Sequence, residues 1–203
     1  IVEELISQVR ARQHEFNNRM MAIEAAVASA DTLEEARKEV ADLTGSIGIS
    51  LNDRELLSCD SKMIAGMLFG KIKQAEAANC HIELSLHGLF KKTVTPETEW
   101  IEAIGILLDN AIEASPKGST IFLSSKKQED FLELTVSNPA PPLSNTEFMA
   151  LFGKGVTTKT NRDGHGFGLY NILRMTERYH GKILTRNESI LNENYVIFGV
   201  LMP

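Results

Sequence analysis

A glycine-rich stretch at residues 154–171 constrains the fold of this chain more than any other segment. Its sequence, KGVTTKTNRDGHGFGLYN, places Gly164, Gly166 and Gly168 at alternate positions before an apolar run with helical spacing. Glycine lets the backbone approach a ligand closely, and the first turn of the next helix offers N–H groups to a phosphate. No strand is expected directly before the glycines and the Walker pattern is missing, so a dinucleotide fold and a P-loop are not indicated. Because such turns also occur where a helix merely packs on a sheet, other stretches must decide between the two interpretations.

The composition is that of an ordinary globular protein and excludes several classes of function. The chain has 203 residues, of which 43% are hydrophobic and 24% charged, and its net charge is −6. An acidic balance without a Lys/Arg cluster argues against direct binding of nucleic acid, and no apolar run approaches the ~18 residues of a membrane span. Cys59 and Cys80 match no metal or redox spacing, so we expect reduced, buried thiols. Since the chain opens on Ile1 within a helical pattern, we interpret it as a piece of a longer protein.

The first 57 residues are expected to form a helical hairpin. Apolar side chains recur at helical spacing from residue 1 to about residue 29, and again over residues 33–47. Asp31 or Thr32 supplies an N-cap for the second helix. Because such a hairpin cannot bury both apolar stripes alone, we expect it to pair with a second copy into a four-helix bundle. The boundary falls between residues 50 and 58, and we predict domains of residues 1–57 and 58–203.

The second domain is predicted to be α+β, with helices layered on one face of a largely antiparallel sheet. Helical and strand patterns follow one another without strict alternation, which argues against a doubly wound parallel sheet. The expected helices cover residues 60–79, 97–114 and 146–152 and a segment from Phe167 onward, and the expected strands cover residues 81–86, 120–126, 131–137, 182–187 and 195–202.

A histidine in the first helix has the neighbours that a nucleophile needs. His14 and Asn18 lie one helical turn apart, with Glu15 beside the histidine. A histidine next to a carboxylate can be oriented and lose its proton, which makes the other ring nitrogen a nucleophile. The alternative is a solvent-facing histidine beside a surface glutamate, a common arrangement on helices. These few residues by themselves favour the alternative.

Two asparagines and a lysine-bearing loop offer complementary contacts to a nucleotide. Asn110 lies off the apolar stripe of its helix and can present a carbonyl oxygen to a hard cation held between phosphates. Asn138 follows a strand, where an amide can contact the edge of a flat heterocycle. Residues 152–159 combine two lysines and two threonines with glycines, as in a lid that closes over phosphates. The structural alternatives are a locally bonded Asn, a turn before Pro139 and a plain surface loop.

In combination, these stretches resemble a sensor histidine kinase of the gyrase–Hsp90–kinase ATPase superfamily. Within that superfamily the chain is most similar to the accessory-gene-regulator-C type of quorum sensor, and next to the citrate and fumarate sensors. The resemblance rests on HEFNN (residues 14–18) as the phosphoacceptor box, LLDNAIEA (107–114) as the N box, the region around Asn138 as the G1 box, residues 148–152 as the F box and GHGFGLYN (164–171) as the G2 box.

The resemblance implies ATP-dependent phosphorylation of a histidine and relay of the phosphoryl group. His14 would accept the γ-phosphoryl group, Glu15 would accept or orient the imidazole proton, and Asn18 would hold the γ-phosphate. The phosphohistidine would then donate to an aspartate of a response regulator, for which the branch implies a LytTR-type DNA-binding domain. The chain would be a homodimer through its N-terminal helices. Membrane helices preceding this piece would anchor it at the cytoplasmic side of a bacterial cell membrane.

The resemblance further implies a Bergerat-type α/β sandwich that binds ATP with Mg²⁺. Asn110 would bind Mg²⁺, and Asn138 would contact the adenine amino group where the family usually has Asp. Lys159 would meet phosphate from the lid. The phosphates would be cradled by Gly164, Gly166, Phe167, Gly168 and Leu169.

Several positions depart from the family pattern. Ile106 stands four residues before Asn110, where histidine kinases commonly have Asn and gyrase-like ATPases have the Glu that activates water. Ala140 and Pro142 replace glycines of the G1 box, and Glu113 stands where many kinases place a lysine. Two alternatives therefore stay open. One is a phosphotransfer scaffold with a degenerate ATP site, and the other, which the apolar Ile106 disfavours, is a gyrase- or chaperone-type ATPase.

Overall fold

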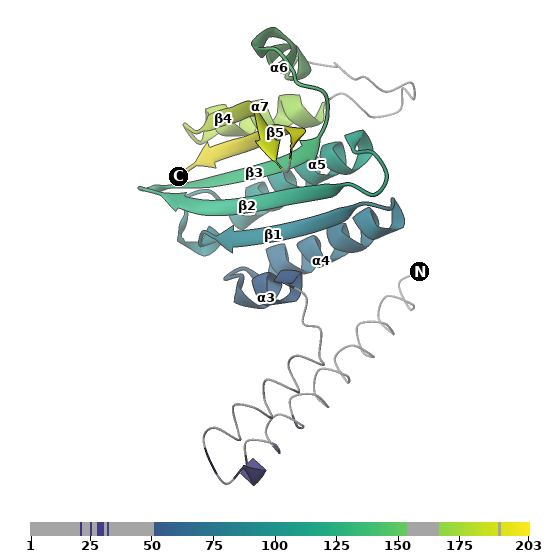
Figure 1. The fold of residues 1–203 in the computed structure, drawn as a ribbon. Helices are drawn as coiled ribbons and strands as arrows, with labels where there is room; N and C mark the ends of the chain where they lie inside the picture. The colour runs from purple at the N-terminus through teal and green to yellow at the C-terminus, as the bar shows by residue number, and fades with distance from the viewer. Residues whose placement is uncertain are drawn as a thin grey trace, which may run out of the picture. The chain divides into compact units, whose positions relative to one another are not determined.

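A computed structural model describes residues 21, 25, 28–30, 32, 51–153, 167–190 and 192–203 (Figure 1). The chain divides into two compact units, Ile1–Ser50 and Leu51–Pro203. The second unit therefore starts seven residues earlier than the predicted domain of residues 58–203, although still within the interval of 50–58 expected for the boundary. The predicted hairpin falls almost entirely outside the described residues, so it stays a prediction.

The second unit is built on a mixed five-stranded sheet with the strand order β1-β2-β3-β5-β4. Only β1 and β2 pair in parallel, and the other neighbours are antiparallel. A parallel pair needs a long crossover, which α5 provides between these two strands. The largely antiparallel α+β domain predicted from the sequence is thereby confirmed. The strands are β1 (His81–His87), β2 (Thr120–Gln128), β3 (Phe131–Pro139), β4 (Lys182–Ile190) and β5 (Glu193–Met202).

Three helices cover one face of the sheet: α4 (Lys62–Ala77), α5 (Glu97–Ala114) and α7 (Gly168–Arg178) (Figure 1). Ser61 caps α4 by accepting the N–H of Ile64 at 3.1 Å, and acidic residues in the first turn of α5 favour its start. None of the helices in the described part of the chain is long and apolar enough to cross a membrane. The remaining helical elements are α3 (Leu51–Ser58), the 3₁₀ turn η1 (Phe90–Lys92) and α6 (Asn145–Leu151).

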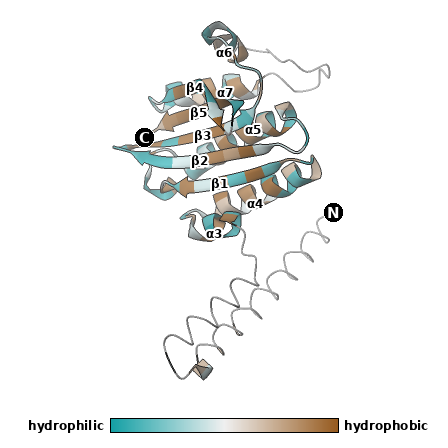
Figure 2. Ribbon diagram, in the orientation of Figure 1, coloured by the Kyte–Doolittle hydropathy of each residue, from teal (hydrophilic) through white to brown (hydrophobic). Residues whose placement is uncertain are grey.

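The hydrophobic core lies between these helices and the sheet. Trp100, Ile104 and Leu108 of α5 have no exposed surface, nor do Ile121 and Leu123 of β2. Figure 2 shows the hydrophobic residues along the central strands and on the helices behind them. Alternate residues of β2 face this core, which is why the strand pattern was visible in the sequence.

Both cysteines are buried and neither forms a disulfide, as the sequence predicted. The Cys59 thiol donates a hydrogen bond to the Ser61 carbonyl at 3.4 Å. Burial raises the pKa of the Cys59 thiol above its ordinary value. A buried thiol with a raised pKa is a poor nucleophile, so Cys59 is a structural residue.

Helix α3 covers the open edge of β1 through side-chain hydrogen bonds. Asn52 Nδ2 donates to the Ile82 carbonyl at 2.5 Å, and the Leu84 N–H donates to Asn52 Oδ1 at 2.9 Å. The Leu86 N–H donates to the Glu55 carboxylate at 2.5 Å. No residue of α3 is fully buried. Leu56 packs partly against the core, and these hydrogen bonds add to what holds the helix against the sheet. They also give partners to backbone groups that an edge strand would otherwise expose.

Replacing Asn52 by Ala should destabilise the second unit by about 1–3 kcal/mol, because two backbone groups of β1 lose their partners. The measurement is urea unfolding of the full chain followed by circular dichroism. Arg54→Ala on the exposed side of α3 is the matched control and should change the free energy of unfolding by less than about 0.5 kcal/mol. Equal effects of the two substitutions would contradict the role given to Asn52.

Candidate functional site

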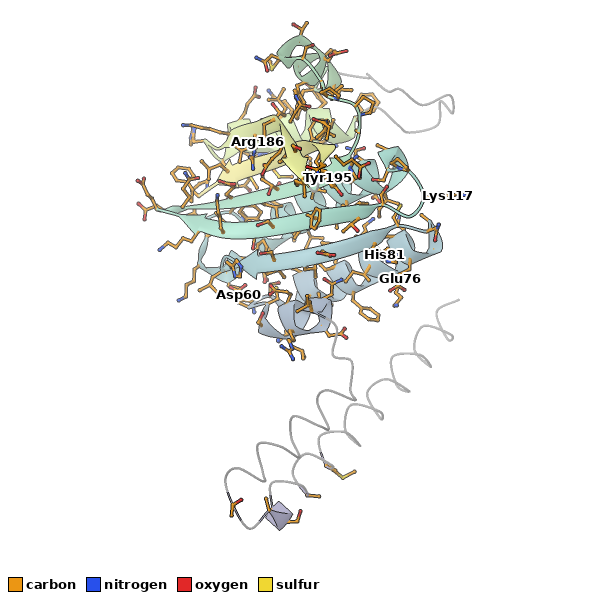
Figure 3. All side chains as sticks on the ribbon, in the orientation of Figure 1. Asp60, Glu76, His81, Lys117, Arg186 and Tyr195 are labelled. Atoms are coloured by element: carbon orange, nitrogen blue, oxygen red, sulfur yellow. The ribbon has the colours of Figure 1, made fainter. Side chains whose placement is uncertain are left out.

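Three elements that carry predicted site residues meet at one end of the sheet. The start of β2 lies beside the end of β3, because Phe122 pairs with Ser137, and the end of α5 leads into β2 through residues 115–119. Lys117 in this turn marks that end of the sheet in Figure 3, and Asp60 marks the other. Helix α7 leads into β4, whose start pairs with the end of β5 and so lies near the start of β3. The start of α7 therefore lies at the same end as the last turns of α5 and the end of β3 (Figure 1).

Asn110, near the end of α5, has a buried side-chain nitrogen without a partner. Within the described residues, the Nδ2 atom is one of only two buried side-chain nitrogen or oxygen atoms that lack a hydrogen bond. Leaving a buried amide unpaired costs about 1–3 kcal/mol, so this amide suits a polar ligand. Rotation of the amide by 180° exchanges nitrogen and oxygen, which would present a cation ligand at this place. The residue thus fits the Mg²⁺ role implied by the resemblance.

Asn138, the penultimate residue of β3, is only 3% exposed. It continues the alternation of Leu134 and Val136, which belong to the core, so its side chain lies on the helix-covered side of the sheet. Its Nδ2 donates to the neighbouring Pro139 carbonyl at 3.3 Å. Asn138 pairs with Val196 of β5 and β3 continues to Pro139, so the residue lies within the strand and does not open a turn. Its carboxamide oxygen is the kind of acceptor that an adenine amino group requires.

Helix α7 begins without a side-chain cap. Phe167 at the N-cap position forms no capping hydrogen bond, and the first turn has no acidic residue. Serines cap α4 and α6, and α5, which also lacks a side-chain cap, has acidic residues in its first turn instead. The N–H groups of Gly168 and Leu169 and the positive end of the helix dipole are therefore suited to an anion. The Leu169 side chain packs against the core, so this residue would serve a phosphate through its backbone.

Ile106 connects α5 with the start of α7. A Cβ atom added to Gly168 would lie 2.9 Å from Ile106 Cγ2, closer than such atoms approach in proteins. The close approach of the two helices therefore requires glycine at position 168. Ile106 and Asn110 lie one turn apart on the same face of α5. Ile106, which the sequence showed only as a departure from the family pattern, thus lies between Asn110, the predicted cation ligand, and the start of α7, the predicted phosphate-binding segment.

The other predicted site residues lie outside the described residues, and their roles stay predictions. The same holds for the predicted lid beyond Gly153. In the part of the chain that is described, no three His, Cys, Asp or Glu side chains gather to hold a metal ion. The residues concerned are His14, Glu15, Asn18, Lys159, Gly164 and Gly166.

The proline-rich segment after β3 is held by two asparagines that sequence reasoning missed. Asn194 Nδ2 donates to the Ala140 carbonyl at 2.8 Å. Asn187 accepts the Leu143 N–H at 2.9 Å and donates to the Leu143 carbonyl at 2.8 Å. The Ala140 N–H still donates to the Asn194 carbonyl of β5 at 3.2 Å. Because the two prolines that follow lack the N–H that a strand ladder needs, the side-chain amides supply the further bonds that hold this segment. Asn187 and Asn194 thus hold the segment that carries the altered G1 box.

Helix α6, which overlaps the predicted F box of residues 148–152, is anchored by a capping box and an aromatic cluster. Ser144 Oγ accepts the Glu147 N–H at 3.3 Å, and the Glu147 carboxylate accepts the Ser144 N–H at 2.7 Å. The bonds from Ser144 lower the pKa of the exposed Glu147 carboxyl. The Phe148 and Phe152 rings lie 5.4 and 6.2 Å from the Phe198 ring. The segment that enters the predicted lid is thereby packed onto β5.

Asn187→Ala should loosen α6, because it removes both side-chain bonds to Leu143 at a cost on the order of 1 kcal/mol. Amide hydrogen exchange of residues 143–151 should accelerate by about fivefold while exchange in α4 stays unchanged. Ser189→Ala, at another exposed position of β4, is the control and should alter neither. Unchanged exchange in α6 of the Asn187 variant would show that these bonds do not hold the segment.

Comparison with known proteins identifies the family. A family model described as the GHKL domain matches residues 98–203, more than half of the chain. The "Probable C4-dicarboxylate sensor kinase" of Halalkalibacterium halodurans is 22% identical over 97% of the chain, and the sensor histidine kinase CitA of Klebsiella pneumoniae is 27% identical over 98%. The chain spans 38% and 36% of the lengths of these two relatives.

Solved structures agree in fold. The catalytic domain of histidine kinase ThkA matches with a TM-score of 0.57 at 23% identity, covering 68% of this chain and 90% of that domain. ThkA in complex with the response regulator protein TrrA matches with a TM-score of 0.54 at 19% identity, covering 98% of this chain and 63% of that one. The resemblance found in the sequence is thereby confirmed: the chain belongs to the GHKL domain family and is similar to sensor histidine kinases.

Proposed function

We propose that this chain is the kinase portion of a two-component sensor, which phosphorylates His14 with ATP and passes the phosphoryl group to an aspartate of a response regulator. The observation that carries this proposal is the convergence at one sheet end of the buried, unpaired Asn110 Nδ2 and the uncapped start of α7. The similarity to sensor histidine kinases supports it.

In this proposal, different residues of the described part of the chain would contact different parts of ATP. Asn110 would hold Mg²⁺ through its amide oxygen, and the backbone at Phe167, Gly168 and Leu169 would bind phosphate oxygens. Asn138 would accept a hydrogen bond from the adenine amino group. Bound Mg²⁺ would neutralise charge on the phosphates. Lys159, Gly164 and Gly166 would complete the phosphate contacts, since phosphoryl transfer depends on positioning and electrostatics.

The phosphoacceptor would belong to the N-terminal helical hairpin, paired in a homodimer as a four-helix bundle. A ring nitrogen of His14 would attack the γ-phosphorus while the bond to the departing ADP oxygen breaks. Glu15 would accept or orient the proton on the other ring nitrogen, and Asn18 would hold the γ-phosphate. For the histidine kinase ThkA, a solved complex with the response regulator protein TrrA provides an example of the kind of partner proposed here.

The setting of the whole protein is also part of the proposal. Membrane helices outside this sequence would anchor the chain at the cytoplasmic side of a bacterial membrane. The regulator would carry a LytTR-type DNA-binding domain, as the similar branch of kinases implies. A phosphotransfer scaffold without ATP binding is the second candidate, favoured by the apolar Ile106 beside the Asn110 amide. A gyrase-type ATPase is disfavoured by the same residue, which cannot activate water.

The test is incubation of the full chain with Mg²⁺ and γ-labelled ATP. Wild type should acquire acid-labile label, and His14→Gln should acquire none because the acceptor is gone. Asn110→Ala should lose at least about tenfold in labelling, because the proposed cation ligand is removed. His87→Gln, an exposed histidine of β1, is the matched control and should label like wild type.

The alternatives give different results in the same assay. Wild type that neither labels nor binds ATP would contradict the kinase and favour the scaffold. Steady ATP turnover that survives in His14→Gln would favour the ATPase. Label retained by His14→Gln would show that another residue is the acceptor.

A further inference from the structure

We infer that Ile106 is a positioning residue, whose side chain sets the separation between Asn110 and the phosphate-binding start of α7. The inference rests on the proposed function and goes beyond it, because it assigns a role to a residue whose apolar side chain cannot bind Mg²⁺ or donate a hydrogen bond to phosphate. Its basis is the contact at Gly168, where an added Cβ would lie 2.9 Å from Ile106 Cγ2 and 3.9 Å from Cγ1.

The Ile106 side chain is a rigid spacer. Isoleucine is branched at Cβ and has one strongly preferred χ1 rotamer in a helix, so its Cγ2 atom cannot swing aside as the end of a long side chain can. The remainder of the side chain packs against the hydrophobic core. A change at this contact must therefore move a helix.

Both helices that meet at this contact are anchored elsewhere. Helix α5 is fixed by Ile104 and Leu108, which have no exposed surface, and α7 by Ile172 and Met175, which are 1% and 3% exposed. Close-packed cores resist such displacements. With both helices held in this way, the contact limits how closely the start of α7 can approach α5, and so helps to set the position of the first N–H groups of α7.

The consequence concerns the phosphate end of the site. Asn110 lies one turn beyond Ile106 on the same face of α5, and Gly168 is the first residue of α7. A cation bound by Asn110 and a phosphate bound at Gly168 must lie close enough together for the phosphate oxygens to contact the cation. Ile106 would set that distance, while the adenine contact at Asn138 comes from a different element.

The test is a double-mutant cycle between the two sides of the contact, measured on the full chain. Calorimetry would give the affinities for a non-hydrolysable ATP analogue with Mg²⁺ and for adenosine, which lacks phosphates. Gly168→Ala should lower the affinity for the ATP analogue by about tenfold, because the added methyl group pushes the start of α7 away from α5. The same substitution should change the affinity for adenosine by less than about twofold. Adding Ile106→Ala to this variant should restore most of the lost affinity for the analogue.

Two matched controls distinguish an effect of the separation between α5 and α7 from a general loss of folded structure. Ile106→Val keeps both γ-carbons and should leave the analogue affinity within about twofold of wild type. Gly105→Ala, at the neighbouring glycine of α5 where an added Cβ meets nothing within 4 Å, should do the same. Thermal unfolding of every variant shows that each one is folded.

The outcomes distinguish this inference from the proposed function. No rescue in the double variant, or parallel losses for the analogue and adenosine, would overturn the positioning role while nucleotide binding by wild type stands. Coupling that is seen in thermal unfolding but not in binding would also overturn it. Wild type that binds neither ligand would overturn the proposed function, and the positioning role with it.

Discussion

The packing of α5 against the sheet is the interaction on which the rest of the second unit depends. Seven of its residues are buried, and Trp100, Ile104 and Leu108 have no exposed surface. The Trp100 indole also donates to Thr93 Oγ1 at 2.9 Å, so the anchor is well oriented. Because Asn110 belongs to the same helix, the core that stabilises the fold also places the predicted cation ligand.

Side-chain amides and carboxylates replace missing strand partners at two places in this domain. Asn52 and Glu55 do so for the edge strand β1, and Asn187 and Asn194 for the proline-rich segment after β3. Backbone groups removed from water need partners, and a carboxamide offers both a donor and an acceptor. The bonds from Asn187 and Asn194 hold the segment that follows Asn138, so they support the candidate site as well as the fold.

Much of the second unit was predictable because its elements follow local patterns. The helical period over residues 97–114 matches α5 (Glu97–Ala114), and the strand alternations recovered all five strands, which extend by a few residues beyond the predicted bounds. Helix α3 was missed, since its polar sequence LNDRELLS has no buried residue to produce a period. Asn110, Asn138 and Gly168 were predicted as site residues from their motifs, and their ligand contacts stay predictions. Asn187 was not, because a single asparagine in a strand carries no signal.

The sequence by itself determined the class of fold, the order of the elements and the family, since all three depend on short-range periodicity and on motifs a few residues long. Only the tertiary structure decided which residues meet. The contact between Ile106 and Gly168 and the bonds from Asn52 to β1 join segments far apart in the chain. Such contacts arise from the way separate elements pack against one core, and no local pattern encodes them. The contact on which the proposed role of Ile106 rests therefore exists only because α5 and α7 pack side by side.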